Sequence, residues 1–192
     1  METKNGLPII HFESQETWET WLQDKHESSD GMWLKIAKKA SGVASVSYTE
    51  AVDAALCYVW IDSQKASYDK DFYLQRFTPR RPKSKWSQIN RQKATEFIEQ
   101  GKMKLAGLRE VELAKEDGRW EAAYASQSTM TVPADFQQVL DDNPQAQAFF
   151  DTLNSSNRYA ILYRIQDAKK PETRARRIEK FIAMLNEQKK VY

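Results

Sequence analysis

The hydrophobic pattern changes near residue 84, and this change limits the fold more than any other feature of the chain. In residues 1–83, short apolar runs typical of strands alternate with segments whose apolar side chains recur every three to four residues, as in amphipathic helices. Residues 84–192 show the helical pattern throughout. We therefore predict an α+β fold, in which a small mixed β-sheet with helices in residues 1–83 is followed by an all-helical part in residues 84–192.

Turn and capping residues divide the first part into a βαβαββ order. Ser14 and the capping box formed by Ser47 and Glu50 are predicted to start its two helices. Residues 63–71 are mostly polar and are predicted to form the turn between the last two strands. The four predicted strands are residues 8–12, 33–36, 59–61 and 72–77.

Serines, glycines and prolines divide the second part into helices. Ser84 is predicted to cap a helix that ends at Gln100, with Gly101 behind it. The polar stretch 125–131 is the best candidate for a linker, although we expect the chain to form one compact unit. The other predicted helices are residues 104–117, two segments that start at Pro133 and Pro144, residues 157–168, and a last helix that starts at Pro171 and carries the apolar stripe Ile178, Phe181, Ile182 and Leu185.

A segment of high positive charge, Leu74–Lys93, lies at the junction of the two parts. It holds seven Lys or Arg and no Asp or Glu, although the whole chain has a net charge of only +2. Pro79 and Pro82 restrict its backbone, so the arginines between them are partly preorganised for a phosphate or carboxylate. We therefore predict an anion-binding site around residues 76–84, the basic loop. Its predicted members are Asp62, Arg76, Thr78, Arg80, Arg81, Lys83, Ser84, Trp86 and Asn90.

The members of this site have different predicted roles. Arg80 and Arg81 would grip the anion, amides at the start of the next helix would add donors, and Trp86 would form a wall of the pocket. Asp62, which follows an apolar strand, would orient an arginine. The sequence also allows a purely structural reading, in which these arginines pair with acidic residues of the helical part, such as Glu110, Glu112 or Glu116.

A second basic cluster occupies residues 157–180. It has eight Lys or Arg against three acidic residues, a net charge of +5. Such a run is usually a solvated helix face, but it can also contact a nucleic-acid backbone. Basic residues beside Pro171 oppose the positive end of the helix that starts there, which favours a bound anion. We expect Arg158, Lys170 and Arg174 to complete the site around the basic loop.

Other kinds of chemistry have little support. One Cys and two His argue against a Cys/His zinc site, and no glycine-rich phosphate loop, nucleophile elbow or dinucleotide fingerprint is present. We predict no metal and no cofactor. No apolar run approaches the roughly 20 residues of a membrane helix, and the first residues lack the apolar centre of a secretory signal. We expect a cytoplasmic protein that does not insert into membranes.

Several motifs resemble one known family. They are Trp60–Asp62, Tyr73–Ser84 with Trp86 and Ser87, Ser156–Ile161, and Ala168–Ile178. Over roughly residues 8–187 they resemble the YdeI/OmpD-associated, or bacteriocin-protection, family. The resemblance implies a role in tolerance of bacteriocins, cationic antimicrobial peptides and envelope stress, with an indirect link to an outer-membrane porin, and it implies no particular reaction. Val59 and Ser63 stand where the family usually has glycines.

Three hypotheses about function follow. In the first, a bacterial stress-tolerance protein binds an anionic small molecule or an acidic protein surface without catalysing a reaction. In the second, the protein is an enzyme that acts on a phosphorylated or carboxylated metabolite, with Asp62 as the general base. In the third, which the weak net charge disfavours, the C-terminal helices bind nucleic acid.

Overall fold

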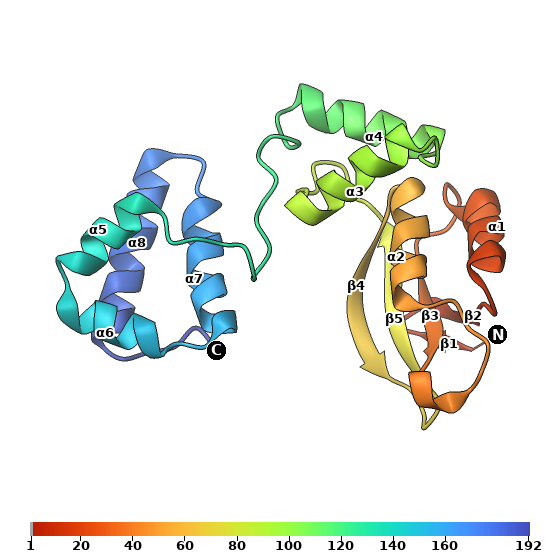
Figure 1. The fold of residues 1–192 in the computed structure, drawn as a ribbon, viewed down its shortest axis with the longest axis horizontal. Coiled ribbons are helices and arrows are strands. Elements are labelled where there is room, and N and C mark those ends of the chain that lie inside the picture. Colours follow the sequence, from red (N-terminus) through yellow and green to blue (C-terminus); the bar gives the residue numbers. More distant parts are fainter. Residues whose placement is uncertain (1) are drawn as a thin grey trace. The chain divides into compact units, whose positions relative to one another are not determined.

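The computed structural model describes residues 2–192, and the chain divides into two compact units (Figure 1). The first unit ends at Ala123, and the second is Tyr124–Tyr192. The predicted α+β class is confirmed, because the first unit holds a five-stranded sheet with helices and the second is built from helices. Residues 125–131, the predicted linker, contain no helix or strand.

The sheet of the first unit has the strand order β1-β2-β3-β5-β4. Strands β2 and β3 are parallel, and the other neighbouring strands are antiparallel. A parallel pair needs a crossover, which helix α1 (Gln15–Lys25) supplies. The strands are β1 (Thr3–Lys4), β2 (Leu7–His11), β3 (Met32–Ala37), β4 (Trp60–Ser67) and β5 (Phe72–Pro79).

Helices α1 and α2 (Tyr48–Cys57) begin at the predicted serines. Ser14 Oγ accepts a hydrogen bond from the backbone N–H of Thr17, and Ser47 Oγ accepts one from Glu50. Each contact is half of a capping box, which satisfies backbone donors that the first helical turn cannot pair internally. A short 3-10 helix, η1 (Lys39–Ser41), lies between β3 and α2.

One hydrophobic core joins the sheet to the helices of the first unit. Trp18, Trp60 and Phe77 are buried in it, together with Ala94 and Val111 from the two helices that follow the sheet. Those helices are α3 (Gln88–Glu99) and α4 (Leu105–Glu116). The first unit therefore extends beyond the predicted junction at residues 83 and 84, because a change from strands to helices does not by itself end a core.

Strand β1 and the short helix η1 were not predicted, and two other elements also differ from the prediction. Strand β4 continues to Ser67, through residues that were predicted to form a turn, and a bulge between Asp62 and Lys65 shifts its register. A bulge interrupts the alternating pattern by which a strand is recognised in a sequence. Helix α3 is capped by Ser87, whose Oγ accepts the N–H of Asn90 at 3.1 Å. Ser84 instead closes a turn, in which its N–H donates to the carbonyl of Arg81 at 3.0 Å.

The second unit packs four helices around a core of its own. The rings of Phe136 and Phe150 meet edge to face, 5.7 Å between centroids, inside this core. The predicted apolar stripe of the last helix is confirmed, since all four of its members are buried. The helices are α5 (Ala134–Asp141), α6 (Pro144–Thr152), α7 (Ser155–Gln166) and α8 (Pro171–Asn186). Within residues 2–192, no helix is both long enough and apolar enough to cross a membrane.

Candidate functional site

The basic loop comprises the last four residues of β5 and the residues that follow it, and it lies beside the start of β4. The backbone N–H of Arg80 donates to the carbonyl of Val59 at 2.7 Å, which continues the pairing of the two strands by one step. Val59 has a φ of +65°, a left-handed conformation that is a genuine outlier for a β-branched residue. Glycine adopts this conformation without strain, whereas valine at position 59 is strained.

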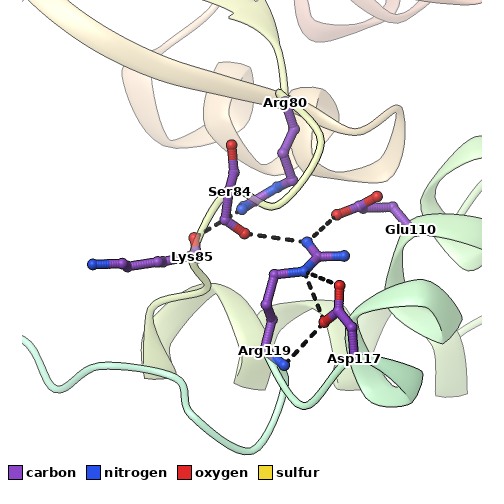
Figure 2. Close-up of polar contacts among 6 residues, drawn as sticks. All are labelled: Arg80, Ser84, Lys85, Glu110, Asp117 and Arg119. Carbon is purple, nitrogen blue, oxygen red and sulfur yellow. Dashed lines mark hydrogen bonds and ion pairs between the residues drawn. The ribbon is translucent and has the colours of Figure 1, made fainter. Parts of the chain in front are cut away.

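Arg80 holds the loop in shape and is not presented to solvent. Its side chain is buried, with 9% of the residue exposed, and the guanidinium lies 4.1 Å from the centroid of the Trp86 ring. Its Nη1 donates to the carbonyl of Lys85 at 3.0 Å (Figure 2). Arg80 therefore ties the loop to Lys85 and Trp86, which follow it, and its predicted contact with an anion stays a prediction.

Arg119, which the sequence analysis missed, clamps the same loop from the end of α4. Its Nη1 donates to the carbonyl of Ser84 at 3.2 Å and to Glu110 Oε1 at 2.5 Å, and its Nε bonds Asp117 at 2.7 Å (Figure 2). Burial lowers the pKa of the Arg119 guanidinium, but the hydrogen bonds to the two carboxylates outweigh it and raise the pKa overall. Arg119 is therefore a permanent cation that ties the loop to α4.

The acidic residues proposed as partners of the loop arginines are used differently. Glu110 pairs with Arg119, and Glu112 pairs with Lys115 at 2.8 Å. The predicted pairing of a loop arginine with Glu110 is therefore not found, because Glu110 is held by the largely buried Arg119, which lies outside the loop.

Arg81 and Lys83 remain as the exposed cations of the loop. Both belong to the turn that Ser84 closes, with Pro82 at its second position. Lys83 has a φ of +65°, as the third position of a type II turn requires, and glycine or asparagine is the usual residue there. The turn therefore carries two exposed positive side chains on a backbone that the Arg80 and Arg119 contacts hold in place.

Asp62 lies within β4 and does not orient an arginine. Its Oδ2 accepts hydrogen bonds from the hydroxyl of Tyr48 at 2.8 Å and from Nε2 of Gln75 at 3.3 Å. Asp62 is in register with Phe77, so Arg76, one residue before Phe77 on β5, points to the opposite face of the sheet. Burial, with the hydrogen bond to Asp62 next, raises the pKa of Tyr48 to about 12. The general-base role of Asp62 stays a prediction.

The other predicted members of the site have less to offer a ligand. Trp86 is buried, with 2% exposed, and meets Trp120 edge to face at 5.0 Å, so both rings belong to the core and not to a pocket wall. Asn90 is bound at its backbone by the cap of α3, and Thr78 is half-buried opposite Ile61.

Four of the eight basic residues in the cluster of the second unit, Arg158, Arg164, Arg174 and Arg177, form hydrogen bonds or ion pairs within that unit. Arg174 forms two parallel bonds to Asp135, at 2.6 and 2.7 Å, and bonds a backbone carbonyl of α7 as well. Arg158 pairs with Asp151 at 3.1 Å. Lys170 is exposed at the residue before α8. The two basic clusters belong to different units, and their union in one site stays a prediction.

Comparison with protein families gave two matches. Residues 129–188 match the model described as "Bacteriocin-protection, YdeI or OmpD-Associated", which confirms the resemblance and locates it in the second unit. Residues 10–110, within the first unit, match the model described as "Domain of unknown function (DUF8412)". The curated proteins and the solved structures gave no match. The model that matches residues 10–110 covers more than half of the 192 residues, so the chain belongs to the family described as DUF8412, and its second unit matches the YdeI/OmpD-associated model.

Proposed function

We propose that the first unit binds an anionic small molecule or an acidic protein surface through Arg81 and Lys83, without catalysing a reaction. The two cations are exposed on the same turn, and Arg and Lys form strong charge-assisted hydrogen bonds to phosphate and carboxylate groups. Arg80 and Arg119 support this role indirectly, because they fix the turn and so lower the entropy lost on binding.

The observation that carries the proposal is the backbone of Lys83. A lysine in the left-handed region costs on the order of 1–2 kcal/mol relative to ordinary backbone conformations, and glycine would avoid most of that cost. Strain of this kind persists where the surrounding structure enforces it, and it is enriched at sites of function. The presence of an exposed, charged side chain at such a strained position supports a role for the charge.

Calorimetric titration of the full chain tests the proposal. The probes are inorganic phosphate, nucleotides, sugar phosphates, dicarboxylates and a polyglutamate peptide. We expect at least one of them to bind the wild type and to bind the double variant Arg81→Gln/Lys83→Gln at least tenfold more weakly. The matched control is Lys39→Gln/Lys70→Gln, which removes two exposed positive charges elsewhere in the first unit.

Two results would contradict the proposal. One is the absence of binding by every probe. The other is equal weakening in the loop variant and in the control, since this would show that net charge alone attracts the anion. Arg80→Ala is unsuitable for the test, because loss of the Trp86 and Lys85 contacts would disturb the fold of the loop.

We further propose that binding serves tolerance of bacteriocins, in keeping with the bacteriocin-protection family whose model matches residues 129–188. A bacterial strain that lacks the gene would be complemented with the wild type or with Arg81→Gln/Lys83→Gln and exposed to a bacteriocin. We expect the wild type to restore survival and the loop variant to fail at equal protein level. Full restoration of survival by Arg81→Gln/Lys83→Gln would show that tolerance does not depend on the cations of the basic loop.

A further inference from the structure

A separate cleft of about 330 Å³ opens on the helical side of the first unit. This volume is at the lower end of the roughly 300–1,000 Å³ typical of small-molecule sites. The walls come from α1, α2, the end of α3 and the segment that leads into α4. None of the members predicted for the basic-loop site lines the cleft.

Opposite charges face this cleft from different elements. Glu19 projects from α1, whereas Lys102 and Lys104 lie on the segment between α3 and α4. Within residues 2–192, neither lysine has a carboxylate within 4.0 Å of its ammonium group, and Glu19 has no cation within that distance. The hydrogen-bond partner of Glu19 is the neutral side chain of Gln15, at 2.6 Å. Both signs of charge are thus presented to the cleft without neutralising each other.

The other two carboxylates of the lining are already engaged. Asp53 forms an ion pair with Lys93 of α3, and Glu50 accepts the backbone N–H of Ser47 at 2.8 Å as part of its capping box. Among the described residues, the charged groups of the lining without an ionic partner are therefore Glu19 and the ammonium groups of Lys102 and Lys104, which lie 6.0 Å from the ring centroid of Phe97 and 5.9 Å from that of Tyr58, respectively.

The floor and the sides of the cleft are small or aromatic. Cys57 and Ala54 of α2 are buried beneath it, and Tyr58 and Phe97 line it. Burial first, and then the charge of Glu19, raises the pKa of the Cys57 thiol to about 11, although Lys104 and Lys102 act against the shift. The thiol therefore stays neutral at physiological pH and serves as a small apolar surface between the negative charge of Glu19 and the positive charges of Lys102 and Lys104.

Backbone hydrogen bonds fix the lysine-bearing wall. The N–H of Lys104 donates to the carbonyl of Cys57 at 3.2 Å, and the N–H of Lys102 donates to the carbonyl of Phe97 at 2.8 Å. Gly107 of α4 packs so closely on this region that an added Cβ would lie 2.7 Å from the carbonyl oxygen of Cys57. The cleft is therefore formed before any ligand arrives, which lowers the cost of binding.

We infer that this cleft binds a small zwitterion of the α-amino acid class. The ammonium group of the ligand faces Glu19, its carboxylate faces Lys102 and Lys104, and its side chain lies against Tyr58 and Phe97. A purely anionic ligand would meet the carboxylate of Glu19, and a purely cationic ligand would meet two ammonium groups. Only a molecule that carries both charges satisfies both walls.

The test compares three forms of the same compounds by calorimetric titration of the full chain. The probes are the twenty free L-amino acids, and, for those that bind, the amide, which lacks the α-carboxylate, and the N-acetyl derivative, which lacks the positive charge of the α-amino group. We expect at least one free amino acid to bind, and both of its derivatives to bind at least tenfold more weakly. Failure of all twenty, or equal binding by either derivative, would overturn the inference.

Two charge variants locate the site. Glu19→Gln and Lys104→Gln should each weaken binding of that amino acid at least tenfold. Their matched controls, Glu13→Gln and Lys39→Gln, remove the same charges from exposed positions outside the cleft and should bind as the wild type does. Thermal unfolding shows that each variant is folded. Unchanged binding in both cleft variants would also overturn the inference, whatever the outcome for the basic loop.

Discussion

Replacing Lys83 with glycine should stabilise the first unit, because the substitution relieves a strained backbone at an exposed site. Left-handed φ costs an L-residue on the order of 1–2 kcal/mol, whereas added freedom of glycine in the unfolded chain costs about 0.5–1 kcal/mol. Lys83 is exposed, so little packing is lost. We therefore expect Lys83→Gly to raise the free energy of unfolding by about 0.5–1 kcal/mol, an increase of a few degrees in Tm.

Lys83→Ala separates backbone strain from charge. Alanine removes the same positive charge but keeps a Cβ, so it retains the strain. In parallel thermal unfolding, the Tm of Lys83→Gly should be clearly higher than the Tm of Lys83→Ala. Both variants should lose affinity for any anion that the basic loop binds. Equal stability of the two variants would refute the strain argument, since any gain would then come from reduced repulsion among the cations of the loop.

Three further predictions concern other parts of the molecule. Gly31→Ala should destabilise the first unit by more than 2 kcal/mol in urea unfolding, roughly the effect of overpacking, because φ is +134° and the new Cβ would lie 2.8 Å from a carbonyl oxygen of β5. Arg174→Ala should destabilise the second unit at neutral pH, because the hydrogen bonds from Arg174 lower the pKa of Asp135 and so stabilise the folded state above the unfolded pKa of that carboxyl group. This stabilisation is lost as pH falls, so the stabilities of variant and wild type should converge in acid. The raised pKa of Tyr48 stabilises the folded wild type below the unfolded pKa of about 10, and this contribution is lost as pH rises through about 12. Unfolding measured between about pH 10 and 12 should therefore show a loss of stability in the wild type that is absent in Tyr48→Phe.

Local signals in the sequence were sufficient for most of the secondary structure. Ser14 and Ser47, which cap α1 and α2, each bond a residue three positions later, so the start of each helix can be predicted from the local sequence alone. Ser84 and Ser87 show the limit of this reasoning. Both can cap a helix, and the choice of Ser87 depends on the turn closed by Ser84 and on burial of Trp86, which belong to tertiary structure.

The candidate site was harder to predict, because adjacent arginines have opposite fates. Arg80 continues the strand pairing and turns inward onto Trp86, whereas Arg81 is exposed one residue later. Composition cannot distinguish them. Arg119 lies 35 residues from Ser84 in sequence, so no local pattern connects it to the loop. The charges of the cleft are likewise spread over separate segments, each of which resembles an ordinary solvated helix face when taken alone.

The bulge in β4 has a consequence for behaviour in concentrated solution. β4 is the eight-residue strand at one side of the sheet, where its outer backbone groups could pair with another molecule. A bulge bends such a strand and breaks the spacing that a partner strand would need, and Lys65 adds a charge at the same place. We therefore expect this border of the sheet to resist edge-to-edge aggregation, and straightening it by deletion of a bulge residue should promote self-association.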